Sequence, residues 1–245
     1  MLNIRHLLRH DMKALLLPQD CFLCGLPVPE KQSDSALICL SCADTLPRIG
    51  RRCPVCAMPT PTGERCGQCL RRPPHFDCTA AALDYAFPVD RLVQSLKYAA
   101  RLPLARLFAR CMLDEVQSRP AHTLPECIIA MPLHPHRLRE RGFNQALEIA
   151  KHLSRQSGVK LRDGVRRVRD TPAQATLRVE QRHSNIRGAF ACDLDLEGKS
   201  VAVVDDVMTT GSTLDELART LKKCGAARVE NWVVARTVTH GGQHV

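Results

Sequence analysis

The stretch VAVVDDVMTTGST, residues 201–213, decides the fold, because an apolar strand runs into a polar turn that opens a helix. The strand ends in the adjacent carboxylates of Asp205 and Asp206, and hydroxyl side chains surround Gly211 in the turn. Backbone N–H groups at a helix N-terminus bind phosphate, and glycine lets the backbone approach an anion closely. The two carboxylates would repel a phosphate but would accept hydrogen bonds from sugar hydroxyls further along the same ligand. A 5-phosphorylated ribose fits this pattern, with phosphate contacts from Thr209, Thr210, Gly211, Ser212 and Thr213.

Short apolar runs alternate with helical patterns from residue 79 onward, which predicts an α/β domain with a mostly parallel sheet. We expect a break in the first long helical stretch at Pro103 and the end of the last helix at Gly225. The expected strands span residues 80–85, 127–131, 200–205 and 228–235. The expected helices lie at residues 92–113, from 142 onward and after 213.

Eight of the thirteen cysteines form four Cys-x-x-Cys pairs, which predicts two metal sites. Two such turns supply the four thiolates of a tetrahedral Zn²⁺ shell with no open position for water, so both sites would be structural. Spacers of 14 and 9 residues favour pairing along the chain, whereas a redox dithiol predicts a single pair at the start of a helix. The predicted ligands are Cys21, Cys24, Cys39 and Cys42 in one site, and Cys53, Cys56, Cys66 and Cys69 in the other.

The cysteine-rich head and the α/β body are expected to be separate domains. The head has few large apolar residues, so metal binding would supply its folding free energy. A basic, proline-stiffened stretch at residues 71–74 follows it. We therefore expect an N-terminal helix and a double zinc ribbon in residues 1–76, and the α/β domain in residues 77–245.

The composition indicates a globular protein with an anionic partner. Of 245 residues, 44% are hydrophobic and 24% are charged, which argues against disorder and coiled coil. The formal charge is +10, which two zinc sites of four thiolates, at −2 each, would lower to +6. Aromatic residues make up only 4%, which argues against a base-stacking RNA-binding sheet. The absence of long apolar runs predicts no transmembrane segment and no signal peptide, so we expect a cytoplasmic protein.

The string at residues 201–213 resembles the phosphoribosyl pyrophosphate (PRPP) loop of type I phosphoribosyltransferases. With the four Cys-x-x-Cys pairs, MPLH at 131–134 and RERGFNQ at 139–145, nearly the whole chain resembles the ComF family, which includes proteins named GntX. TPAQ at 171–174 and the Arg, Asn and Gly-Ala-Phe of residues 182–190 also match. The resemblance implies a small double zinc-ribbon head, with four cysteines in each ribbon, followed by a type I phosphoribosyltransferase-like domain.

The resemblance also implies how the site would work. Asp205 and Asp206 would hold the ribose 2′- and 3′-hydroxyls, the hydroxyl-rich turn would wrap the 5′-phosphate, and Mg²⁺ would sit on the pyrophosphate and the diol. A mobile loop near residues 171–185 would cover the ligand. The implied role is in natural competence and the handling of imported single-stranded DNA, with DNA-uptake machinery at the inner membrane face as a possible partner.

The turn after Met131 is a candidate pyrophosphate loop, because the carboxyl ends of parallel strands meet at one edge of a sheet. Arg137 and Arg139 are candidate PRPP contacts, although each could equally be a solvated surface charge. The candidate catalytic residues are Arg139, Arg141 and Gln174.

Basic residues concentrate in residues 137–187, where thirteen Lys and Arg against five Asp and Glu give a balance of +8. Such a cluster can bind PRPP or track a phosphate backbone by charge, without sequence preference. A solvated basic face is the alternative interpretation. The candidate DNA contacts are Arg166, Arg167 and Arg169.

Three functions remain open on this basis: a PRPP-binding protein that assists the uptake or utilisation of single-stranded DNA, a genuine phosphoribosyltransferase with an unidentified nitrogen acceptor, and a non-catalytic PRPP sensor. A phosphoribosyltransferase needs a hood that selects the base, and only nine residues follow Arg236. Unless the zinc head acts as that hood, the acceptor pocket is missing, so the sequence favours the first function.

Overall fold

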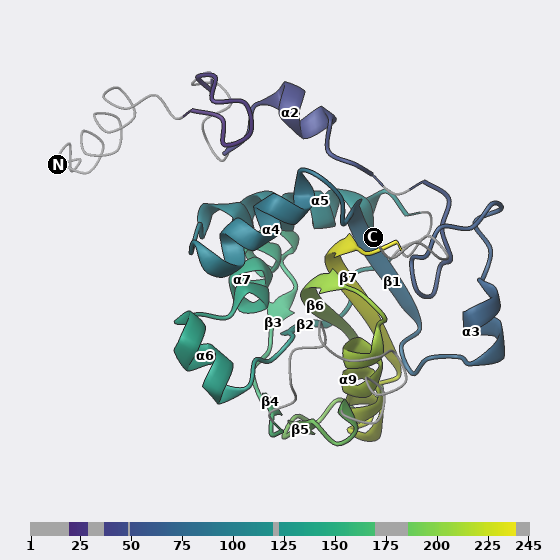
Figure 1. Cartoon of the computed structure of the whole chain (residues 1–245). Helices are drawn as coiled ribbons and strands as arrows, with labels where there is room; N and C mark the ends of the chain where they lie inside the picture. Colours follow the sequence, from purple (N-terminus) through teal and green to yellow (C-terminus); the bar gives the residue numbers. More distant parts are fainter. Residues whose placement is uncertain (1–19, 29–36, 49, 120–122, 170–185, 239–245) are drawn as a thin grey trace, which may run out of the picture. The chain divides into compact units, whose positions relative to one another are not determined.

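The computed structural model describes residues 20–28, 37–48, 50–119, 123–169 and 186–238 (Figure 1). The chain divides into two compact units, residues 1–46 and residues 47–245. The first cysteine group lies in the smaller unit, and the second lies in the larger unit with the α/β body. The predicted domain boundary at residue 76 stays a prediction, and the expected N-terminal helix falls outside the described residues.

The smaller unit is built around the turn that carries Cys21 and Cys24. The N–H of Gly25 donates to the carbonyl of Cys21 at 2.8 Å, and Gly25 has a φ of +69°, which explains the glycine at this position. Helix α2 (Leu40–Asp44) begins directly after Cys39. The larger unit repeats this plan: a tight turn carries Cys53 and Cys56, and α3 (Gly67–Arg71) begins directly after Cys66.

The larger unit contains a five-stranded parallel sheet in the order β1-β7-β6-β2-β3. A separate antiparallel pair, β4 (Val165–Arg167) and β5 (Phe190–Cys192), lies beside it. The strands of the main sheet are β1 (Cys78–Asp84), β2 (Cys127–Ala130), β3 (Lys160–Leu161), β6 (Ser200–Met208) and β7 (Arg228–Arg236).

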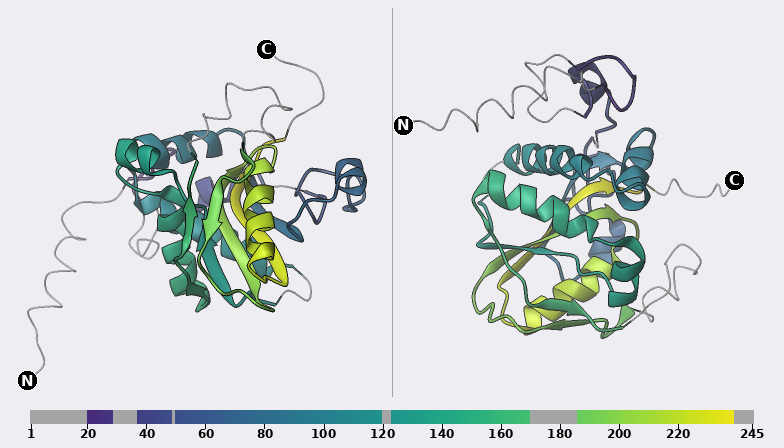
Figure 2. Two further views of the ribbon diagram at one scale, coloured as in Figure 1. Left: turned by 90° about the horizontal axis from the view of Figure 1, so that it is seen from below. Right: turned by 90° about the vertical axis from the view of Figure 1, so that its left-hand side faces the viewer.

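Helices cover both faces of this sheet (Figure 2). Helices α5 (Pro103–Gln117) and α7 (Gln145–Ser157) cover one face, and α9 (Ser212–Lys223) covers the other. The shorter helices are α4 (Val89–Tyr98) and α6 (Pro135–Arg141).

The structure confirms the predicted α/β class, the four predicted strands and the helix break at Pro103, which is the first residue of α5. Two differences bear on the site. Strand β6 continues to Met208, because Asp205 and Val207 still pair with β7, so the two aspartates lie inside the strand. The expected pyrophosphate turn is short, because Pro135–Arg141 forms helix α6 between the cap of His134 and Gly142, whose φ is +79°.

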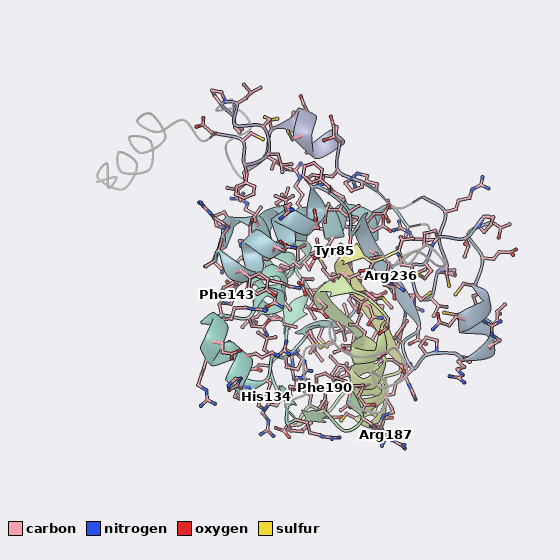
Figure 3. All side chains as sticks on the ribbon, viewed as in Figure 1. Tyr85, His134, Phe143, Arg187, Phe190 and Arg236 are labelled. Carbon is pink, nitrogen blue, oxygen red and sulfur yellow. The ribbon has the colours of Figure 1, made fainter. Side chains whose placement is uncertain are left out.

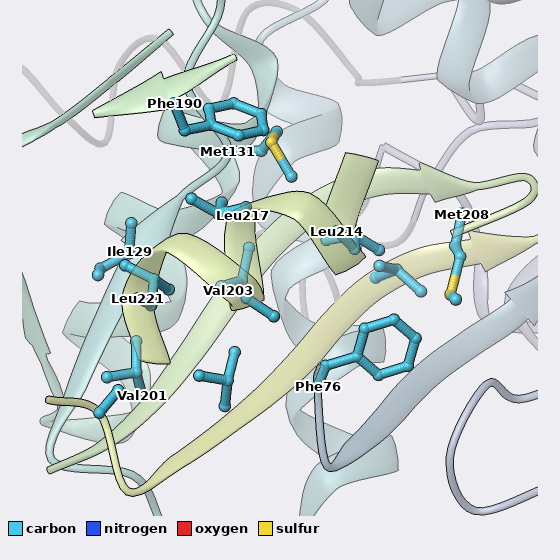
Figure 4. Packing of buried hydrophobic residues seen from close by; sticks show 14 of the residues in the cluster. Phe76, Ile129, Met131, Phe190, Val201, Val203, Met208, Leu214, Leu217 and Leu221 are labelled. Atoms are coloured by element: carbon cyan, nitrogen blue, oxygen red, sulfur yellow. The ribbon is translucent and has the colours of Figure 1, made fainter. Parts of the chain in front are cut away.

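One core joins the second cysteine group to the sheet. Cys53, Cys56 and Cys69 belong to the same buried cluster as Phe76 and residues of β6, β7 and α9, part of which is drawn in Figure 4. The second ribbon is therefore packed into the α/β body. No helix in the described part of the chain is long and apolar enough to span a membrane.

Candidate functional site

The two adjacent aspartates lie near the carboxyl end of β6, where they meet a lysine from α4. Asp206 is 4% exposed, and its Oδ2 forms an ion pair with Nζ of Lys97. Asp205 is half-buried, and its Oδ1 accepts the backbone N–H of Asp206 at 2.8 Å. A buried carboxylate is stable only when it is paired, so Lys97 is part of this site.

Lys97 also makes the two aspartates chemically different. Burial and the charge of Asp206 raise the pKa of Asp205 well above its usual value. Burial acts on Asp206 in the same direction, but the attraction of the Lys97 ammonium outweighs it, so the pKa of Asp206 is lowered. Near neutral pH, Asp206 is therefore ionised, while Asp205 holds a proton more readily than an exposed aspartate does.

Sequence reasoning missed Lys97, because the helical pattern drew attention only to its leucines. Val89, Leu92, Val93 and Leu96 form the buried face of α4. Lys97 follows Val93 by four positions and therefore borders that face. A lysine beside an apolar stripe was the available signal, but its partner is far away along the chain.

The hydroxyl loop, residues 209–213, runs from the end of β6 into the first two residues of α9. Gly211 has a φ of +83°, a conformation that favours glycine, and it stands at the N-terminus of α9. The hydroxyls of Thr210 and Ser212 are 2.9 Å apart, and the N–H of Ser212 donates to Thr210 Oγ1 at 3.3 Å. The loop therefore presents hydroxyls at a helix N-terminus, which has the chemistry of an anion site.

Arg141, the last residue of α6, links the segment after β2 to α4. Its guanidinium lies 5.5 Å from the centre of the Tyr98 ring and donates to Gln145 Oε1 at 2.6 Å. Tyr98 directly follows Lys97, so Arg141 contacts the end of the helix that carries Lys97. Arg139 is exposed and Arg137 is half-buried on α6, and neither is among the residues that contact Tyr98 or the aspartates in the described part of the chain.

The predicted DNA contacts lie on and just after β4, and two of them line a groove of about 610 Å³. Arg166 pairs with Asp193 at 2.7 Å, and Arg169 donates to the carbonyl of Arg187 at 2.5 Å. The guanidinium of Arg167 lies 5.8 Å from the centre of the Phe190 ring. Residues of the turn after β2, His134 among them, form the opposite side of the groove.

Gln174 and the rest of the expected mobile loop lie outside the described residues. His134 accepts the N–H of His136 and caps α6. Among the described residues, the two four-cysteine groups are the only sets of three or more side chains placed to share a metal ion.

Each cysteine group brings four sulfur atoms to within 4.8 Å of one another. The Sγ atoms of Cys24 and Cys39 are 3.8 Å apart, and those of Cys56 and Cys66 are 3.6 Å apart. A tetrahedral zinc with bonds of about 2.3 Å requires sulfur atoms roughly 3.8 Å apart. Both groups therefore fit Zn²⁺.

One thiol in each group has a lowered pKa, which favours the thiolate form that binds a metal. Burial opposes this, but backbone N–H groups from Cys24 and Cys39 lower the pKa of Cys21 to about 6. In the second group, backbone N–H groups from Cys56 and Cys66 lower the pKa of Cys53 to about 7 against the same opposing effect. Amide groups aimed at sulfur are the outer-shell contacts that stabilise a metal-bound thiolate.

A cavity of about 480 Å³ lies between the second cysteine group and the hydroxyl loop. Its walls include Gln68 and Arg72 on the ribbon side and Thr210 and Ser212 on the loop side. Phe76 and Met208 supply apolar surface. The polar and apolar surfaces together are typical of a small-molecule pocket.

Known protein families match both parts of this chain. Family profiles described as a double zinc ribbon domain and a phosphoribosyl transferase domain match residues 12–70 and 143–242. DNA utilization protein YhgH of Escherichia coli O6:H1 is 35% identical over 229 residues, which cover 91% of this chain and all of that protein. The chain belongs to the ComF/YhgH family.

A second ComF/YhgH relative, Competence protein F of Haemophilus influenzae, is 34% identical over 180 residues, which cover 71% of this chain and 79% of that protein. A solved glutamine PRPP amidotransferase from B. subtilis, complexed with ADP and GMP, aligns with a TM-score of 0.39 at 18% identity. That alignment covers 57% of this chain and 30% of that chain. In this ComF/YhgH protein, the four-cysteine groups are the two zinc ribbons and the parallel sheet is the phosphoribosyltransferase-like domain.

Proposed function

We propose that the protein binds PRPP with Mg²⁺ at the end of β6 and assists the uptake or utilisation of single-stranded DNA. The observation that carries the proposal is the adjacent pair of half-buried Asp205 and buried Asp206 shortly before the hydroxyl loop and its Gly211 turn. The loop would hold the 5′-phosphate and the aspartates would accept hydrogen bonds from the ribose diol. Mg²⁺ would neutralise the pyrophosphate, as a hard cation that keeps several water ligands.

Lys97 and Arg141 extend the proposed site toward the pyrophosphate. Lys97 pairs with Asp206 in the free protein, and a bound diol would share Asp206 with it. Arg141 stacks on Tyr98, the next residue after Lys97, so both cations contact or belong to α4. Both cations favour a ligand that carries several negative charges next to the ribose.

The DNA part of the proposal rests on charge and on the relatives. Arg166 and Arg167 line a groove next to the turn after β2, within the segment that carries a balance of +8. The relatives are named DNA utilization protein YhgH and Competence protein F. Most residues that line the groove are apolar, so a single strand would be held there mainly through contacts of its phosphates with Arg166 and Arg167. The place of action we propose is the cytoplasm, at the inner membrane face.

Calorimetry with PRPP and Mg²⁺ tests the ligand part. Replacing Asp205 and Asp206 by alanine removes the diol acceptors, and should weaken binding by about 3 kcal/mol or more, because hydrogen bonds to charged groups are worth roughly 1.5–3 kcal/mol each. Asp114→Ala removes an exposed carboxylate from α5 and should leave the affinity unchanged. Equal affinity in the double variant and the wild type would place the ligand elsewhere.

A genuine phosphoribosyltransferase is the second candidate, and the cavity of about 480 Å³ favours it. The second ribbon supplies a wall beside the hydroxyl loop, so the cavity offers room for an acceptor. The reaction would form a bond between C1 of the ribose and an acceptor nitrogen, release pyrophosphate, and pass the nitrogen proton to solvent. Pyrophosphate release in the presence of a panel of nucleobases distinguishes this enzyme from a PRPP-binding protein without turnover.

A further inference from the structure

One buried arginine joins the second cysteine group to the hydroxyl loop. Arg236 is the last residue of β7, is 5% exposed, and lies beside Tyr85 at the end of the sheet (Figure 3). Its Nε donates to the carbonyl of Cys56 at 2.9 Å. Its Nη1 donates to the carbonyl of Met208 at 3.0 Å and also to that of Thr209, the first residue of the loop. A single guanidinium therefore contacts a zinc-ribbon turn and the start of the loop.

Two further contacts hold the loop and α9 from the same side. The backbone N–H and Nδ1 of His75 lie 2.6 and 3.0 Å from Oδ1 of Asp215, in the first turn of α9. Met208 packs so closely on Gly211 that a Cβ there would lie 2.6 Å from its Cε, and Phe76 lies behind it (Figure 4). His75 and Phe76, which follow the second ribbon, thus lie against the first turn of α9 and against Gly211.

We propose that Arg236 is a positioning residue, through which the metal of the second four-cysteine group sets the affinity of the hydroxyl loop for a sugar phosphate. This inference rests on the proposed function, because it assumes that the loop holds the 5′-phosphate. Zn²⁺ on Cys53, Cys56, Cys66 and Cys69 would fix the turn that presents the Cys56 carbonyl. That carbonyl holds the guanidinium, which in turn holds the carbonyls of Met208 and Thr209.

The physical basis is preorganisation. A loop that binds phosphate through backbone N–H groups must keep them convergent before the ligand arrives, since ordering each residue on binding costs about 1–2 kcal/mol. The planar guanidinium can donate in two directions at once, toward Cys56 and toward Met208, whereas a lysine ammonium has a single donor centre. Arg236→Lys therefore keeps the charge and breaks the bridge.

Loss of the Arg236 contacts should weaken binding of the 5′-phosphate end of the ligand and not of its pyrophosphate end. The acceptors of Arg236 are the carbonyls of Cys56, Met208, Thr209 and Thr237, and none of them belongs to the turn proposed for the pyrophosphate. A purely structural role would weaken both ends of the ligand alike. Ribose 5-phosphate and magnesium pyrophosphate are therefore the two probes.

The first experiment measures both probes by calorimetry on the full chain, wild type and Arg236→Lys. Ribose 5-phosphate should bind at least about tenfold more weakly to the variant, the loss expected for one charge-assisted hydrogen bond. Magnesium pyrophosphate should stay within about twofold, and the zinc content should remain two per chain. An unchanged affinity for ribose 5-phosphate, or an equal loss for both probes, would overturn the inference. If the wild type binds neither probe, the proposed function fails and this inference fails with it.

A matched pair of cysteine variants tests the metal, and decides the matter if Arg236→Lys does not fold. Cys66 and Cys39 are both half-buried and both immediately precede a short helix, α3 and α2 respectively. Each serine variant should lose one zinc. Cys66→Ser should weaken ribose 5-phosphate binding at least about tenfold, as Arg236→Lys does, with magnesium pyrophosphate within about twofold. Cys39→Ser should leave both probes unchanged, because its group lies in the separate unit of residues 1–46. Equal ribose 5-phosphate affinities in the two variants would contradict the coupling.

Discussion

The two cysteine groups share one ligand pattern and differ in their surroundings. In the first group only Cys21 is buried and Cys24 is exposed, and the group lies in a unit of 46 residues. In the second group Cys53, Cys56 and Cys69 are buried, and they share a hydrophobic core with the sheet and α9. The same zinc-ribbon motif therefore serves once as a self-contained unit and once as part of the phosphoribosyltransferase-like body.

This difference teaches that the cysteine spacing determines the local metal site but not how that site packs in the larger fold. Arg52, next to Cys53 of the second group, pairs with Glu115 of α5 at 2.7 Å, and Arg236 of β7 donates to the carbonyl of Cys56. Loss of metal from the second group should therefore reach the ligand site. Loss from the first group should remain within its own unit.

The largest expected effect is on stability, in the matched variants Cys53→Ser and Cys21→Ser. Both residues are buried, and each is the first cysteine of the tight Cys-x-x-Cys turn of its group. Cys53→Ser should lower the main thermal transition by more than about 10 °C, since metal binding supplies about 10 kcal/mol or more in small zinc domains and 1 kcal/mol shifts this size of domain by roughly 2–4 °C. Cys21→Ser should leave that transition within about 2 °C. Calorimetric scans with zinc analysis decide the point, and equal shifts would erase the distinction between the groups.

Within the larger unit, Lys97→Met should be the next most damaging change. It leaves the carboxylate of Asp206, which is 4% exposed, without its cation, and such a loss costs about 3–5 kcal/mol. Lys151→Met breaks the more exposed pair with Glu148 and should cost less than about 1 kcal/mol. Denaturant unfolding compares the two variants. If their costs are the same, Lys97 does not hold the aspartate site.

The pH dependence of stability separates the two aspartates. Burial raises the pKa of Asp205 in the folded protein above its usual value of 3.8, so the folded state binds this proton more tightly than the unfolded state does. Stability from this group is thus full below about pH 3.8 and is lost as the pH rises through the raised pKa. Asp205→Asn should therefore raise the melting temperature at pH 7 and lose this advantage near pH 3.5. A melting temperature at pH 7 below that of the wild type would mean that Asp205 is stabilised as an anion.

The smallest expected effect concerns DNA. Replacing Arg166, Arg167 and Arg169 by alanine should reduce the slope of log K against log salt for single-stranded DNA by about two to three. Arg91, Arg101 and Arg106 are exposed near or in α4 and α5, and the same replacement there should leave the slope unchanged. Fluorescence anisotropy across a salt series gives both slopes. Equal slopes in the two triple variants would remove the β4 region from the DNA path.

The features that could be predicted from the sequence are those whose residues lie close together along the chain. The β6–α9 junction was predictable because an apolar run, two acids and a glycine turn follow one another within thirteen residues. Both four-cysteine groups were predictable because their ligands lie close along the chain. Helix α6 was not, because its arginine-rich sequence buries no residue and depends on the caps at His134 and Gly142.

The contacts that matter most for the proposed function lie beyond such patterns. Lys97 meets Asp206, and Arg236 meets Cys56, only after distant segments pack together. Neither residue carries a local signature of its role, since a lysine after a leucine stripe and an arginine at a strand end are both ordinary. Their partners are set by the tertiary fold, which is why the structure was needed to find them.

Hydrogen exchange of the backbone amides, with and without PRPP and Mg²⁺, tests the central claim most directly. The claim is that the ligand binds at the end of β6 in a body that includes the second ribbon. We expect protection in peptides that cover residues 205–215 and the second cysteine group, with no change in residues 20–28 and 37–46. Protection in the first cysteine group, with none in residues 205–215, would contradict the account.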